Sequence, residues 1–114
     1  MDRKKELKAI YKEMKPAMGI YLYQCIPTGK AYIGASQRLK AFMNRINFQL
    51  GMGSFLNKAL QNDWNQYGEG NFIVKVLDIL EYDKNDEVKK DYSEDLAILL
   101  AEWMGKFENA EVIL

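Results

Sequence analysis

The sequence contains no histidine, only one cysteine and only two prolines among its 114 residues. Because histidine is missing, Ser-His and Cys-His catalytic pairs are excluded, and we expect Cys25 to be a small apolar strand residue. One cysteine also excludes an internal disulfide and fits a reducing compartment. Zinc sites with paired cysteines and glycine-rich phosphate loops are equally missing from the sequence.

Long apolar runs are missing as well. None reaches the roughly 20 residues that a membrane-spanning helix needs, so we expect no membrane partner. The hydrophobic fraction of 48% and the charged fraction of 28% are typical of globular proteins. The length predicts a single domain over residues 1–114.

The chain has no formal net charge, but its charges are unevenly distributed. Residues 1–60 hold eleven Lys or Arg against three Asp or Glu, whereas residues 61–114 hold five against thirteen. This asymmetry favours an anionic partner for the first half or attraction between oppositely charged faces. Such faces would meet within one chain or between the copies of a homo-oligomer, and the sequence leaves both readings open.

The most informative stretch is a predicted hairpin over residues 18–35. Two apolar runs flank residues 27–30, whose Pro-Thr-Gly-Lys composition is typical of a turn. Alternate residues of a strand share a face, so Tyr21 and Tyr23 point the same way. Cross-strand pairing predicts that Tyr32 lies beside Tyr21. Taken alone, these tyrosines are equally typical of half-buried strand residues.

The remaining elements follow from periodicity. Apolar spacing predicts an N-terminal helix over residues 2–15, further helices over residues 39–50 and 55–67, and a C-terminal helix over about residues 85–105. Residues 72–77 form a continuous apolar run, which predicts a central strand. The order predicts an α+β fold with a small three-stranded antiparallel sheet flanked by helices.

The triplets Gly19-Ile20-Tyr21 and Tyr32-Ile33-Gly34 resemble the signature of the GIY-YIG nuclease superfamily. The resemblance covers roughly residues 15–103 and implies the same α+β architecture. It further implies a DNA endonuclease scaffold with one Mg²⁺ or Mn²⁺ ion. The family is common in phages and mobile elements, so the resemblance implies the cytoplasm of a bacterial or phage-infected cell.

The resemblance also implies roles for individual residues. In the family's nucleases the first tyrosine helps to activate water and the second supports it, positions matched by Tyr21 and Tyr32. An arginine on the next helix stabilises developing charge. That position is Phe42 here, and Arg45 lies one helical turn further along. A histidine common in the family corresponds to Phe55.

The metal-binding glutamate of the family lies three residues before an aromatic residue that resembles Trp103. That position is Leu100, and Glu102 is the fallback carboxylate, about 200° around the helix. Without a carboxylate at this position, we expect no metal site and no resident cofactor. Mg²⁺ or Mn²⁺ would be expected only if the site were active.

Three hypotheses follow. The first is a catalytically impaired GIY-YIG-like domain that binds nucleic acid or a phosphate-bearing nucleotide. The second is an active Mg²⁺- or Mn²⁺-dependent endonuclease with a rearranged site, in which Tyr21, Tyr32 and Arg45 would be catalytic. The third is a protein-interaction or inhibitor module that also self-associates. The expected ligand-binding residues are Tyr21, Tyr23, Lys30, Tyr32, Gly34, Arg38 and Arg45.

Overall fold

The computed structural model describes residues 15–83 and 91–113. Its first strands, β1 (Met18–Cys25) and β2 (Ala31–Ser36), form the predicted antiparallel hairpin. The turn closes with a hydrogen bond from the Gly29 amide to the Cys25 carbonyl, and Gly29 has a φ of 74°, which glycine adopts without strain. Turn chemistry and β-branched flanks therefore place the hairpin correctly.

Two helices follow the hairpin, α2 (Leu39–Met52) and α3 (Lys58–Tyr67). The Asn57 side chain accepts a hydrogen bond from the Leu60 amide and caps α3. A short 3₁₀ helix, η1 (Glu69–Asn71), leads into β3 (Phe72–Leu80). The chain then forms α4 (Ser93–Met104) and β4 (Ala110–Val112). The predicted helix over residues 2–14, and the start of the helix predicted from residue 85, lie outside the described residues.

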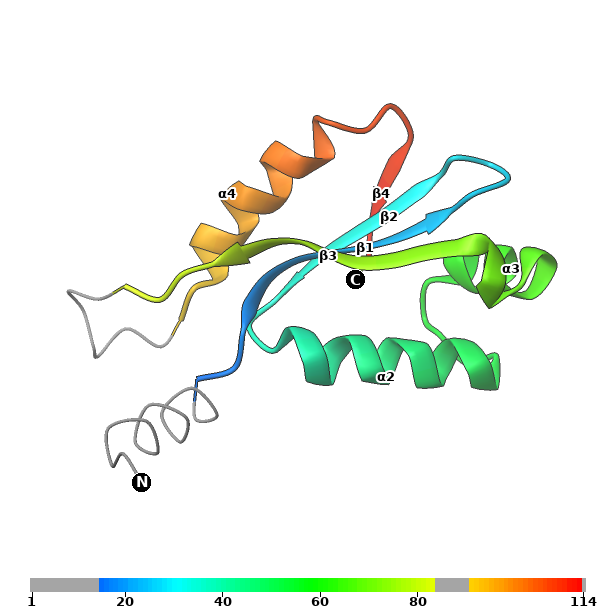
Figure 1. Ribbon diagram of the computed structural model, residues 1–114, viewed down its shortest axis with the longest axis horizontal. Coiled ribbons are helices and arrows are strands. Elements are labelled where there is room, and N and C mark those ends of the chain that lie inside the picture. Colours follow the sequence, from blue (N-terminus) through cyan, green and yellow to red (C-terminus); the bar gives the residue numbers. More distant parts are fainter. Residues whose placement is uncertain (1–14, 84–90, 114) are drawn as a thin grey trace, which may run out of the picture.

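The fold class is the predicted α+β arrangement, with one correction. The sheet has four strands, in the order β3-β1-β2-β4, and it is mixed because β4 runs parallel to β2. Figure 1 shows α4 on one face of this sheet, with α2 and α3 on the other. The three-residue β4 is too short to give a clear sequence signal.

A second correction concerns β3. The continuous apolar run predicts a central strand, but β3 lies at the edge of the sheet described here. Ile73, Val74, Val76 and Ile79 are accordingly exposed. The neighbouring strand β1 is an interior strand, as is β2, and its residues Ile20 and Leu22 and both of its tyrosines are buried. An apolar run shows that a strand is a good sheet former, not that both of its edges are paired.

Each face of the sheet has its own core. The side chains Tyr21, Tyr23 and Tyr32 pack with the buried faces of α2 and α3, in a cluster that we call the aromatic face. Ile20, Leu22 and Ile33 pack against α4, in a cluster that we call the aliphatic face. This division follows from the two-residue period of the strands. None of the helices within the described residues is long and apolar enough to span a membrane.

Candidate functional site

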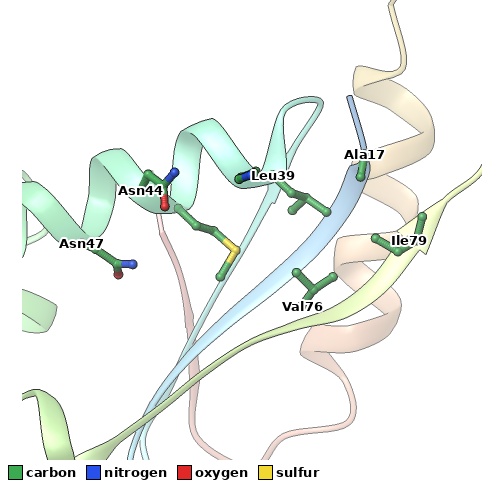
Figure 2. Close-up of a pocket in the computed structure, with 8 residues that line it drawn as sticks. Ala17, Leu39, Asn44, Asn47, Val76 and Ile79 are labelled. Atoms are coloured by element: carbon green, nitrogen blue, oxygen red, sulfur yellow. The ribbon is translucent and has the colours of Figure 1, made fainter. Parts of the chain in front are cut away.

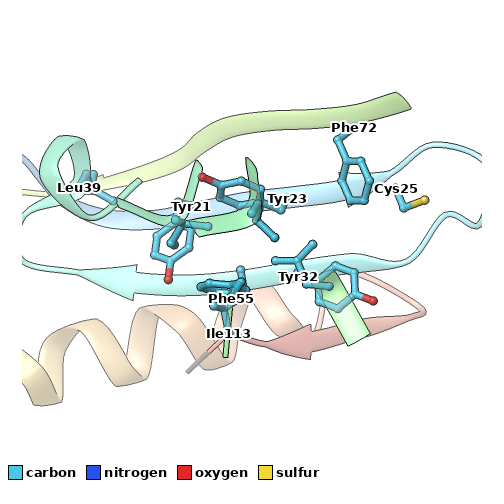
Figure 3. Close-up of a cluster of buried hydrophobic side chains, with 11 residues drawn as sticks. Tyr21, Tyr23, Cys25, Tyr32, Leu39, Phe55, Phe72 and Ile113 are labelled. Atoms are coloured by element: carbon cyan, nitrogen blue, oxygen red, sulfur yellow. The ribbon is translucent and has the colours of Figure 1, made fainter. Parts of the chain in front are cut away.

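The three motif-region tyrosines lie close together but in a different register from the predicted one. Tyr32 is the cross-strand partner of Tyr23, whereas Tyr21 is opposite Gly34. The prediction that Tyr32 lies beside Tyr21 was therefore wrong by two residues. The Tyr21 and Tyr23 rings meet edge to face, with their centroids 6.1 Å apart. Figure 3 shows the three rings on one face of the hairpin.

Two of the three phenols are held by side chains that the sequence did not single out. The Tyr32 hydroxyl donates to Asp63 Oδ2 on α3 at 2.6 Å, and the Tyr23 hydroxyl donates to Asn47 Oδ1 on α2 at 2.6 Å. These partners are 31 and 24 residues away along the chain, so no local pattern indicates them. Each phenol thus ties the hairpin to one helix of the aromatic face.

Burial makes these phenols weaker acids than a phenol exposed to water. All three side chains are at most 1% exposed. Desolvation raises the pKa of Tyr21 and of Tyr23 well above the ordinary value, and the nearby Tyr23 adds to the effect on Tyr21. Desolvation also raises the pKa of Tyr32, to which the hydrogen bond from its hydroxyl to Asp63 contributes. A phenol with a raised pKa stays protonated at neutral pH, whereas general-base catalysis is favoured by a pKa near the working pH.

The glycines of the two triplets are explained by close approaches. A Cβ on Gly34 would collide with the ring and hydroxyl of Tyr21, which lies across it. A Cβ on Gly19 would collide with the backbone carbonyl of Asp78, next to the point where the pairing of β1 with β3 shifts register. The motif glycines therefore allow the tyrosine ring and the edge strand to pack closely against the hairpin.

Helix α2 places an aromatic ring at the position where the resemblance implies arginine. The Phe42 ring lies 6.0 Å from the Tyr21 ring, between centroids, and helps to cover it. Arg38 and Arg45 flank this ring at helical spacing, and both side chains are exposed. The Ser36 hydroxyl accepts a hydrogen bond from the Arg38 amide, which positions the residue before α2. Two exposed arginines therefore lie before and after Phe42 in the sequence, four and three residues from it.

Lys30 lies apart from this pair. Its ammonium is 3.2 Å from Glu111 Oε2 on β4 and 5.0 Å from the centroid of the Tyr32 ring. Lys30 precedes β2 and Arg38 follows it, so about 20 Å of extended chain separates the two residues. The structure therefore places Gly34 opposite Tyr21 and Arg38 just beyond the end of β2, and it places Lys30 before the start of this strand, beside the Tyr32 ring. Arg45 is exposed on α2.

The expected metal position lies on the aliphatic face. Leu100 packs there with Trp103 and the sheet residues Leu22 and Ile33. Glu102, the fallback ligand, is exposed, and no group of three or more His, Cys, Asp or Glu in residues 15–83 and 91–113 could hold a metal ion. A leucine in an aliphatic cluster does not fit the oxygen ligands that Mg²⁺ and Mn²⁺ require.

A second feature that the sequence did not indicate is a groove between α2 and β3. It has a volume of about 360 Å³, and Figure 2 shows the side chains around it. The β3 wall contributes Val76 and Ile79, and the α2 wall contributes Lys40, Asn44 and Asn47. The exposed alternate residues of β3 are the signal that would have located it, once β3 is recognised as an edge strand.

Neither a protein-family model nor a curated protein matches this chain. Two solved structures do. The catalytic domain of homing endonuclease I-TevI matches with a TM-score of 0.65 and 20% identity, over 85% of this chain and 98% of that one. A mutant of the catalytic domain of intron endonuclease I-TevI matches with a TM-score of 0.61 and 20% identity, over 80% and 84% of the two chains. The chain therefore has a GIY-YIG-like α+β fold.

Proposed function

We propose that this chain is a catalytically impaired GIY-YIG-like domain that binds nucleic acid or a phosphate-bearing nucleotide. The observation that carries the proposal is the replacement of polar groups by apolar ones around the motif tyrosines. Phe42 covers Tyr21, and Leu100 belongs to the aliphatic face. These are the positions at which the resemblance implies the charge-stabilising arginine and the metal-binding glutamate.

The buried phenols support the loss of cleavage. The Tyr32 hydroxyl donates a hydrogen bond to Asp63, and the Tyr21 side chain is almost fully covered. A water molecule that attacks a phosphodiester would therefore have little access to either phenol. Without a metal ion and without an arginine at position 42, the negative charge that develops on the phosphate would lose its expected stabilisation, which is usually the largest catalytic contribution.

The exposed cations of α2 support binding. Arg38, Lys40 and Arg45 lie within eight residues, and the first turn of α2 has no acidic residue. Guanidinium groups pair with phosphate oxygens in a bidentate manner. The ligand would then cross the end of the hairpin above Tyr21 and Phe42.

Cleavage is tested on supercoiled and branched DNA with Mg²⁺ and then Mn²⁺. We expect no product from the wild type. Activity that appears in the double variant Phe42→Arg/Leu100→Glu would support a scaffold disabled at these two positions, provided that near-UV circular dichroism shows a folded protein. Wild-type cleavage that disappears in Tyr21→Phe would contradict the proposal and favour a working endonuclease with a rearranged site.

Binding is tested by fluorescence anisotropy with a labelled single-stranded oligonucleotide and with a labelled nucleoside triphosphate. We expect Arg38→Ala/Arg45→Ala to weaken binding at least tenfold. We also expect the slope of the logarithm of oligonucleotide affinity against the logarithm of salt concentration to become shallower by about one to two, as for the loss of one or two phosphate contacts. The matched control is Lys58→Ala/Lys75→Ala, which removes two exposed cations on α3 and β3. Equal losses in both double variants would overturn the proposed site.

A further inference from the structure

The outer face of α2 carries large apolar side chains that the fold leaves uncovered. Phe48 and Met52 are 68% and 67% exposed and lie four residues apart, so they share one side of the helix. The opposite side is buried through Leu39, Ile46 and Leu50. Exposed apolar residues on successive turns are typical of an interaction surface. The only charged residues of α2 are Lys40 and Arg45, both basic and both exposed.

The outer face of α4 has the opposite charge. Its buried side packs on the sheet, and Ile98 on the outer side is 63% exposed. Glu94 and Glu102 lie four residues before and after Ile98, so both carboxylates flank it on the same side of the helix. Every charged residue of α4 is acidic. One helix therefore offers an apolar surface with cations, and the other offers an apolar surface with anions.

We propose that the outer face of α2 binds the outer face of α4 of a second copy of this chain. Apolar contact between Phe48 and Ile98 would be accompanied by ion pairs between Arg45 and the two glutamates. Complementary charge of this kind selects a partner and fixes its orientation. The proposed contact would explain the uneven distribution of charge between the two halves of the sequence as a feature of association between molecules.

The positions of the two helices determine the symmetry of this assembly. α2 and α4 cover opposite faces of the sheet (Figure 1), so one partner cannot engage both at once. The contact is heterologous, and each copy keeps one free α2 face or one free α4 face. The assembly therefore grows head to tail with protein concentration and does not stop at a two-fold dimer.

Sedimentation velocity of the full chain tests this at low and high salt. At about 0.01 M salt, where charges act over about 30 Å, we expect a weight-average mass that rises with concentration above that of one chain. At about 1 M salt, where screening acts within about 3 Å, we expect this rise to be lost. A single-chain mass at low salt over the whole concentration range would overturn the proposal.

Charge reversal tests the pairing of the two helices. Lys40→Glu/Arg45→Glu gives two acidic faces, and Glu94→Lys/Glu102→Lys gives two basic faces. We expect each double variant to be monomeric alone and an equimolar mixture of the two to associate. The control Lys58→Glu/Lys75→Glu changes net charge equally but leaves α2 and α4 intact, so it should still associate. Loss of association in this control would assign the effect to net charge and contradict the proposal.

Because Arg45 belongs to both proposed surfaces, an apolar variant separates them. Phe48→Ser changes an exposed side chain and should leave the fold intact. We expect it to abolish self-association and to leave oligonucleotide affinity unchanged. Self-association that persists in Phe48→Ser would show that the outer face of α2 is not the contact.

Discussion

The two faces of the sheet are built from different chemistry. On the aromatic face, buried tyrosines donate hydrogen bonds to Asp63 and Asn47 of the covering helices. On the aliphatic face, Leu22 and Ile33 pack against Leu100 of α4, and Trp103 Nε1 of α4 donates to Asp78 Oδ2 of β3 at 3.0 Å. The motif tyrosines thus persist as structural parts of one core, while the position of the expected metal ligand has become part of the other. This comparison separates what keeps the fold from what a nuclease would need.

The aliphatic face should give the largest loss of stability. Leu22 of β1 is buried against α4, so Leu22→Ala removes apolar contacts and leaves a cavity. We expect a loss of about 2–5 kcal/mol in the free energy of unfolding. Urea unfolding followed by circular dichroism measures it. A loss below 1 kcal/mol would show that α4 does not pack tightly on this face.

The next loss of stability is expected where a substitution adds volume to the aromatic face. Gly34→Ala places a methyl group against the Tyr21 ring, and we expect a loss of about 1–3 kcal/mol by urea unfolding. The control is Gly51→Ala on α2, where the new Cβ meets no atom within 4 Å. That change should stabilise the protein by about 0.5–1 kcal/mol, because alanine favours a helix. Equal effects of the two changes would contradict the close approach at Gly34.

The sequence predicted the parts of this fold that depend on local chemistry. Turn residues 27–30 and alternating strand residues located the hairpin, and apolar spacing located α2 and α3. It did not predict the edge position of β3, because an apolar run does not report which neighbours pair with it. It also did not predict β4, whose three residues pair with a strand about 80 positions earlier.

The candidate site was predictable in part. The triplets singled out Tyr21 and Gly34, which the structure places opposite each other, but the predicted neighbour of Tyr21 was Tyr32. The resemblance pointed to position 42, and the Phe42 ring does lie against the Tyr21 ring. The partners Asp63 and Asn47 could not be found, because each contact depends on how a helix docks on the sheet. A single sequence shows which residue types are present, but docking decides which of them meet.

A substitution of similar effect should separate hydrogen bonding from packing on the aromatic face. Tyr32→Phe keeps the ring and removes the donor to Asp63, leaving a half-buried carboxylate without this bond. We expect a loss of about 1–3 kcal/mol in the free energy of unfolding. In the double variant Tyr32→Phe/Asp63→Leu, both polar partners are gone and part of the loss should be recovered. Additive losses in the double variant would show that the two residues do not interact.

The response to pH is the last difference expected between the two faces. Because the pKa values of Tyr21, Tyr23 and Tyr32 are raised in the folded protein, the folded state holds its phenol protons above pH 10 while the unfolded state releases them. Stability is therefore fully present below about pH 10 and is lost as pH rises through the folded pKa values, by about 1.4 kcal/mol per pH unit for each phenol.

Urea midpoints measured between about pH 8 and pH 11 test this dependence. Tyr21→Phe should lower the alkaline slope by the share of one phenol, whereas Leu22→Ala should lower stability equally at every pH, because it removes no titrating group. An unchanged slope in Tyr21→Phe would show that its phenol ionises as easily in the folded chain as in the unfolded one. The aromatic face would then be open to solvent, and the argument that Tyr21 is too well covered to activate water would lose its basis.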